Sequence, residues 1–141
     1  MIISINRETD TEIYYPLEYG EKICRSRYWL INNYLFMQPI NTLSHKINNR
    51  VIVLHITDKS IDLVKTFPKS DDQIVSDVVH ISDNLVAMVD QHEIQILDTE
   101  NEFVCVKSID LGTEKIRTVV GYEDCLITVN YLSEIKVYDL I

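Results

Sequence analysis

A gap-free internal repeat constrains this chain more than any other feature. Residues 78–99 read VVHISDNLVAMVDQHEIQILDT, and residues 119–140, which lie 41 positions later, read VVGYEDCLITVNYLSEIKVYDL. Ordinary residue usage gives about one or two identities in a window of this length. The two segments share seven: Val78 with Val119, Val79 with Val120, Asp83 with Asp124, Leu85 with Leu126, Glu93 with Glu134, Ile94 with Ile135, and Asp98 with Asp139. The chain is therefore expected to fold as a series of similar units.

Each unit consists of short apolar runs separated by polar turns. The most regular unit predicts strands near residues 76–81, 85–89, 93–97 and 103–109. A repeat of about 40 residues made of short strands is typical of a β-propeller blade. The expected fold class is therefore all-β, with antiparallel four-stranded blades of a β-propeller.

The first half of the chain follows the same order of strands and turns. Asn32-Asn33 precedes an apolar run, as Asp83-Asn84 and Asp124-Cys125 do in the later units. We expect a hairpin turn at each of these pairs, because Asn and Asp favour tight turns. Residues 38–50 form a polar insertion that is longer than the equivalent connection in the later units, and we expect an exposed loop there.

Counting strands over the whole chain gives the pattern cd-abcd-abcd-abc, a partial propeller. Closed propellers need four to eight blades. The chain is therefore either a piece of a longer propeller, or a half propeller completed by a partner or by a second copy whose residues 12–17 add a strand to the last blade. Within a single domain, residues 1–141, we assign residues 1–22 to the cd strands of a shared blade, 23–70 and 71–113 to one blade each, and 114–141 to the abc strands of a last blade.

The ends of the third strands carry a family resemblance. Leu97-Asp98 and Tyr138-Asp139 stand there in two units, and Ile56-Thr57 is a poorer match. At these positions the chain resembles the WD40-like propeller repeat family, in which a Trp-Asp pair ends the third strand, although the Gly-His pair that usually opens such a repeat is absent. The resemblance implies a rigid, non-catalytic platform whose loops and faces hold other proteins or short peptides.

Composition excludes several classes of function. The chain has 13 basic and 22 acidic residues, a formal net charge of −9, which disfavours direct nucleic acid binding. No apolar run approaches the roughly 20 residues of a membrane-spanning helix, and the N-terminus lacks the apolar segment of a signal peptide. Cys24, Cys105 and Cys125 lack C-x-x-C spacing, so neither disulfides nor zinc are indicated. We expect a cytoplasmic or nuclear protein.

No catalytic, cofactor-binding or metal-binding residues are indicated. The sequence lacks phosphate-binding and nucleophile motifs. The histidines share no ligand spacing; they are His45, His55, His80 and His92. The aspartates that recur by repeat position are interpreted as turn residues rather than as paired carboxylates; they are Asp83, Asp98, Asp124 and Asp139.

Two segments are candidates for protein contact. The residues Arg25, Arg27, Tyr28 and Trp29 form the only cluster of basic and aromatic side chains, and these types dominate interface hot spots. Alternatively, Tyr28 and Trp29 pack in the core while the arginines are solvated. The second candidate is the insertion at residues 38–50, with His45 and Lys46, because insertions in one repeat often map to a binding face.

The expected function is a non-catalytic protein–protein interaction scaffold, a subunit of a larger complex with other protein subunits. One alternative is an accessory subunit of an RNA-processing or RNA-modifying assembly. Another is a homodimeric, head-to-tail closed propeller that binds a small ligand or peptide.

Overall fold

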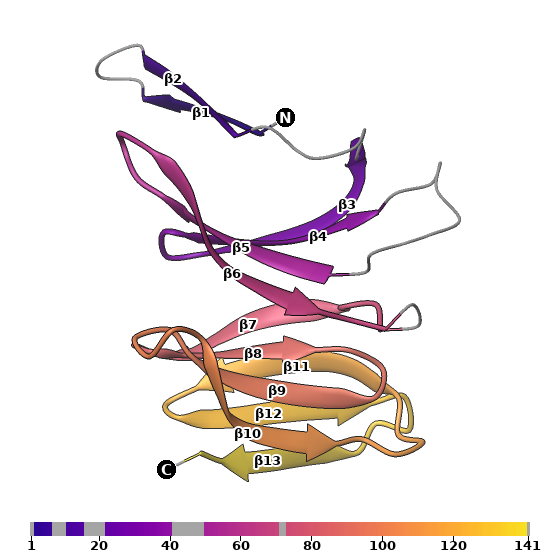
Figure 1. The fold of residues 1–141 in the computed structure, drawn as a ribbon. Helices are drawn as coiled ribbons and strands as arrows, with labels where there is room; N and C mark the ends of the chain where they lie inside the picture. The colour runs from indigo at the N-terminus through magenta and orange to yellow at the C-terminus, as the bar shows by residue number, and fades with distance from the viewer. Residues whose placement is uncertain (1, 7–10, 16–21, 41–49, 71–72, 141) are drawn as a thin grey trace. The chain divides into compact units, whose positions relative to one another are not determined.

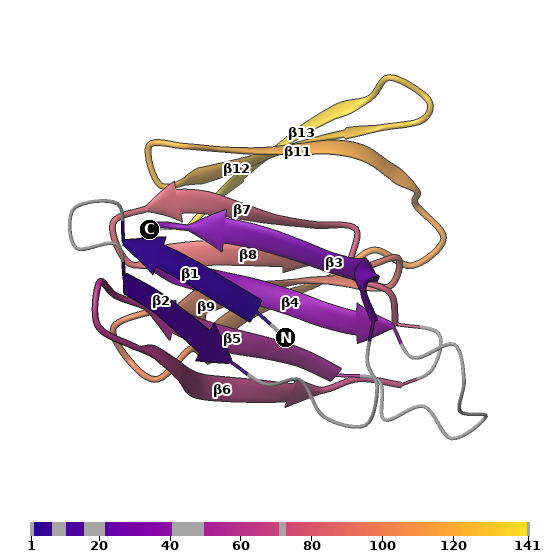
Figure 2. The same cartoon turned by 90° about the horizontal axis from the view of Figure 1, so that it is seen from above.

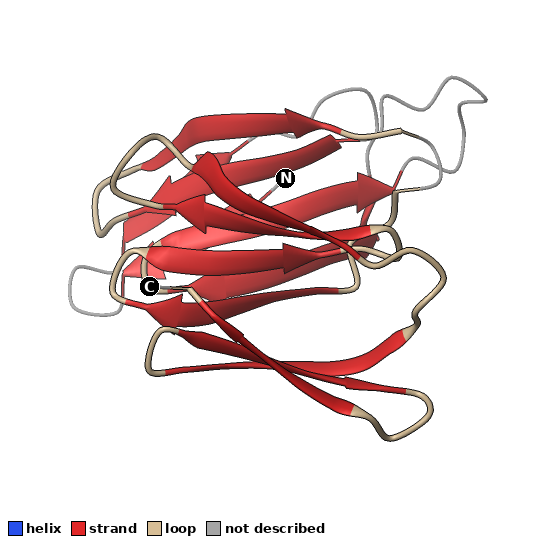
Figure 3. Cartoon of the chain, turned by 90° about the horizontal axis from the view of Figure 1, so that it is seen from below, coloured by secondary structure: helices blue, strands red, loops and turns tan. Residues whose placement is uncertain are grey.

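A computed structural model describes residues 2–6, 11–15, 22–40, 50–70 and 73–140, with side chains for residues 27–39, 50–70 and 73–140. These residues form only strands, turns and irregular segments (Figures 1 and 3). None of the described residues belongs to a helix long and apolar enough to span a membrane. The all-β prediction is confirmed.

The described strands pair as antiparallel sheets of consecutive strands, and the three larger sheets have four, four and three strands. Figure 2 shows this order for β3 to β6. The first two strands form a hairpin, β1 (Ile2–Asn6) and β2 (Thr11–Tyr15). The next sheet contains β3 (Lys22–Ile31), β4 (Tyr34–Ile40), β5 (Arg50–Ile56) and β6 (Ile61–Pro68). The third contains β7 (Asp77–Ser82), β8 (Leu85–Val89), β9 (Glu93–Asp98) and β10 (Val104–Asp110), and the last contains β11 (Ile116–Tyr122), β12 (Cys125–Asn130) and β13 (Ile135–Asp139).

The chain divides into two compact units, Met1–Asp72 and Gln73–Ile141. In the first unit, one face of the β3–β6 sheet carries a cluster formed by Met37, Ile52, Leu54 and Ile61, with Leu35 and Ile56 packed against it. Gln38 and Pro39 are buried and belong to β4, so the expectation of an exposed loop that begins at residue 38 is wrong for these two residues. Residues 41–49 lie outside the described residues.

In the second unit the sheets β7–β10 and β11–β13 pack against each other (Figure 1). Both contribute to one core, which includes Ala87, Ile94, Ile96, Val119 and Leu126. The first strands of these two sheets, β7 and β11, approach each other closely. A Cβ atom built on Gly121 would lie 2.0 Å from the carbonyl oxygen of His80. Only glycine fits this contact without a shift of the backbone.

One expected turn lies one residue earlier than predicted. Tyr122 pairs with Cys125, so the β11–β12 turn is Glu123-Asp124 instead of Asp124-Cys125. Both turn residues have positive φ, 45° and 63°, as a type I′ hairpin requires. The cause is a register irregularity in β7 between His80 and Ser82, which adds a residue that β11 lacks at this point.

The connection between the second and third strands of the last sheet restores the 41-residue offset. Asp90 N donates to Glu93 O in the third sheet, and Asn130 N donates to Glu134 O in the last, a turn that is one residue longer. The repeat therefore holds at an offset of 41 for β7 with β11 and for β9 with β13. Between them, β12 follows β8 at an offset of 40.

Candidate interaction surface

The sheet β11–β13 is apolar on both faces. Its inner face packs on β7–β10 through Val119, Leu126 and Tyr138. The opposite face, which we call the outer face, consists of Val120, Ile127, Val129, Ile135 and Val137. Val120 is 50% exposed, Ile135 69% and Val137 63%. Exposed apolar side chains that adjoin one another in this way mark an interaction site more often than a solvated surface.

The outer face is the structural counterpart of a face that is covered in this same chain. Val120 pairs with Ile127, which pairs with Val137. The corresponding row in the third sheet is Val79, Ala87 and Ile96. Those three side chains pack in the core between β7–β10 and β11–β13. The same type of surface is thus covered in one sheet and exposed in the next.

The edge of the last sheet is also open. Within the described residues β13 pairs with β12 alone, whereas β9 and β5 each pair with a fourth strand. Asn130 N donates to Glu134 O, and Leu140 N donates to Asp124 O, both at 3.1 Å. Because antiparallel hydrogen bonds join alternate pairs, the intervening residues direct their backbone groups away from β12. These residues are Ile135, Val137 and Asp139, and two of them also belong to the outer face.

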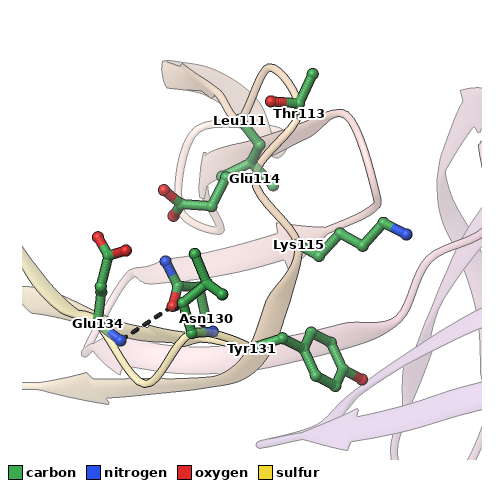
Figure 4. A pocket seen from close by; sticks show the side chains of 8 residues that line it. Leu111, Thr113, Glu114, Lys115, Asn130, Tyr131 and Glu134 are labelled. Atoms are coloured by element: carbon green, nitrogen blue, oxygen red, sulfur yellow. Dashed lines mark hydrogen bonds between the residues drawn. The ribbon is translucent and has the colours of Figure 1, made fainter.

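A pocket of about 530 Å³ lies where the β10–β11 connection meets the β12–β13 turn (Figure 4). Its lining includes Leu111, Glu114, Lys115, Tyr131 and Leu132. Tyr131 N donates to Lys115 O at 3.1 Å, which ties the two segments together. The pocket combines a few charged groups with apolar side chains, and the described residues contain no cluster of His, Cys, Asp and Glu that could hold a metal ion.

A buried amide holds the turn beside this pocket. Asn130 is 6% exposed, and its Oδ1 accepts a hydrogen bond from the backbone N–H of Leu132 at 2.9 Å. The same oxygen accepts a second one from the backbone N–H of Glu134 at 3.0 Å (Figure 4). Asp90 does the same at the β8–β9 turn, where its Oδ1 accepts from His92 N at 2.7 Å and from Glu93 N at 3.0 Å. These two residues anchor their turns.

Charged groups surround the open sheet. Lys136 forms an ion pair with Glu114, and this contact raises the pKa of the Lys136 ammonium group. At the other end of the sheet, the β11–β12 turn contributes Glu123 and Asp124, and Asp139 ends β13. This end of the outer face therefore has a negative rim.

The predicted contact residues are separated by the geometry of β3. Tyr28 pairs with Met37 and is 60% exposed, whereas Trp29 pairs with Phe36 on the opposite face and is half-buried. Arg27 is exposed. Arg25 lies in β3 but its side chain is not described, and His45 and Lys46 lie outside the described residues. Their role in protein contact stays a prediction.

Among the recurring aspartates, Asp98 acts as a turn residue: its Oδ1 accepts hydrogen bonds from Glu100 N and from Asn84 Nδ2. The sequence interpretation overlooked Asp90 and Asn130, because they match only at an offset of 40. It also overlooked the outer face, although the adjacent apolar pairs in β11, β12 and β13 were a visible signal.

No protein-family model matches the chain, and no curated protein is detectably similar to it.

Proposed function

We propose that this chain is a non-catalytic protein-interaction module built of propeller-like blades, and that the outer face of β11–β13 is its binding surface. The observation that supports this is an apolar sheet face that is exposed here while its counterpart on β7–β10 is covered. The finer assignment to the WD40-like repeat family rests on Leu97-Asp98 at the end of β9 and Tyr138-Asp139 at the end of β13.

The energetics favour a protein partner over a small ligand. Burying an apolar side chain contributes roughly 1.5–3 kcal/mol, and three of the five on the outer face are at least half exposed. A partner that covers this face gains a part of that free energy from each side chain, in proportion to the apolar area that is still exposed. The free edge of β13 adds main-chain hydrogen bonds for an extended segment, the mode known as β-strand addition.

Site-specific crosslinking tests this proposal. The photocrosslinking amino acid benzoylphenylalanine is placed at position 137 in the full chain, and at position 106 as a matched control. Val137 and Val106 are both exposed, by 63% and 55%, but Val106 lies in β10. In extracts of the source cells we expect a protein adduct of defined mass at position 137 only.

The captured protein is then purified and its affinity is measured by calorimetry. Val137→Lys should raise the dissociation constant about 30-fold or more, because it places a charge in an apolar contact. Val106→Lys should leave it within about twofold. Equal adducts at both positions, no protein adduct at position 137, or unchanged affinity of Val137→Lys would refute the proposed surface.

A further inference from the structure

We propose that the outer face of β11–β13 packs head to tail on the exposed side of β3 in a second copy of this chain. The inference rests on the proposed function, since it names the partner of the same surface. It follows from a second uncovered apolar patch on the molecule.

That patch consists of Tyr28 and Leu30, which are 60% and 67% exposed. In the sheet register they lie opposite Met37 and Leu35, so they share a face with the core cluster of the first unit. The patch is therefore an extension of a packing face, left exposed along the edge strand β3. A further sheet that covered it would extend that core.

The repeat makes the two patches complementary. Counted back from the first hairpin turn of each sheet, Tyr28 corresponds to Val119 and Leu30 to Gly121. Val119 and Gly121 lie on the face of β11–β13 that packs on β7–β10. Tyr28 and Leu30 therefore lie on the face of β3–β6 that corresponds to this packing face of β11–β13. The outer face of β11–β13 corresponds to the other side of the same contact, the face of β7–β10 on which β11–β13 packs. Among the described residues, each type of face has an uncovered example.

The contact between copies must be wider than the contact within the second unit. Gly121 leaves no room for a Cβ atom against the backbone of His80. Leu30 stands at the equivalent position of β3, so its side chain has to be accommodated between the sheets. We expect β11 of one copy and β3 of the other to lie further apart than β11 and β7 do within one chain, with Tyr28 and Leu30 filling the space between them.

Light scattering after size-exclusion chromatography tests the inference on the purified full chain, over about 1 to 100 μM. We expect twice the chain mass at the upper concentrations. Val137→Glu and Leu30→Lys should each raise the dimer dissociation constant about 30-fold or more. Val106→Lys, an equally exposed substitution on β10, should leave the dimer unchanged.

A mixing experiment separates loss of contact from loss of folding. In a two-copy ring, an equimolar mixture of the Val137→Glu and Leu30→Lys chains keeps one contact with the natural residues on both sides and pairs Glu with Lys in the other. The mixture should therefore form the dimer that neither chain forms alone. A dimer that Leu30→Lys leaves intact, or a mixture that stays monomeric, would overturn the head-to-tail contact.

The failures of the two proposals are distinguishable. If the natural chain is monomeric at every concentration while position 137 still captures a different protein, the second copy is the wrong partner and the binding surface stands. If the chain is monomeric and position 137 captures no protein, both proposals fail.

Discussion

Gly121 should be the least replaceable small residue of the second unit. Its position in β11 lies against the backbone of β7, and a Cβ atom there would meet His80 O at 2.0 Å and Ile81 Cα at 2.8 Å. Real Cβ atoms essentially never approach within 3.0 Å, so Gly121→Ala has to part the two strands by about 1 Å. The obstacle is backbone on both sides, which no change of rotamer relieves.

The expected cost is that of an overpacked core, about 1–3 kcal/mol. A unit of about 70 residues has a total stability of roughly 4–10 kcal/mol, so the loss is a large fraction of it. For a domain of this size, about 2 kcal/mol lowers the melting temperature by about 8–16 °C. Thermal unfolding followed by far-ultraviolet circular dichroism measures the shift.

Gly112 provides the matched control. Its φ is +58°, and a Cβ atom there would meet nothing within 4 Å, so alanine costs only backbone strain of about 1–2 kcal/mol. Asparagine tolerates positive φ but is larger. Gly112→Asn should therefore be milder than Gly112→Ala, whereas Gly121→Asn should be more harmful than Gly121→Ala. A melting temperature within about 2 °C of the natural chain for Gly121→Ala, or the same order at both glycines, would refute the steric argument.

Three further outcomes are expected. Leu126→Ala should cost about 2–5 kcal/mol of stability because Leu126 is fully buried, and Ile127→Ala should cost less than half as much because Ile127 is only partly buried. Equal costs, measured by chemical denaturation, would contradict the offset of 40 in β12. Asn130→Ala should cost about 1–3 kcal/mol of stability because two backbone N–H groups lose their acceptor, whereas Asn130→Asp should retain most of the stability because Asp90 accepts the same kind of bonds in its own turn. An alanine variant as stable as the aspartate variant would count against Asn130 as the anchor of the turn. Burial raises the pKa of Asp77 above 3.8 in the folded chain, so its ionised form costs stability above that raised pKa and the cost disappears as the pH falls toward the unfolded value. Asp77→Asn should therefore raise the melting temperature slightly at neutral pH and not at about pH 3; an equal gain at both would exclude ionisation as the cause.

The strands could be predicted from the sequence because their apolar residues recur with the period of a pleated sheet and their turns carry Asn and Asp. The strand pattern in the described residues follows the expected order, two strands followed by sheets of four, four and three. The Asn32-Asn33 turn is also found where it was expected, with φ of 52° at Asn32. These features depend on local residue preferences, which a single sequence contains.

The one-residue offset of β12 could not be predicted because it depends on a bulge. The gap-free alignment matches Asp83 with Asp124 and Leu85 with Leu126. In the structure Asn84 and Asp124 are equivalent, since the carbonyl of each accepts a hydrogen bond from the residue that follows the third strand. A β-bulge changes the register without a clear residue signature. The role of Gly121 could not be predicted for a different reason. Its neighbour His80 is distant in sequence and is contacted through the backbone.

The composition of the last sheet supports the proposal that its outer face and its open edge belong to one interaction. An antiparallel sheet that faces water on one side alternates apolar and polar residues. Leu126-Ile127 and Val137-Tyr138 instead place an apolar residue on each face, as in β8, whose residues from Val86 to Val89 are all buried. A ligand in the pocket beside Tyr131 would leave this face in water. The proposed partner is therefore a β-structured protein, because a sheet of that protein can cover the outer face and one of its strands can pair with the β13 edge.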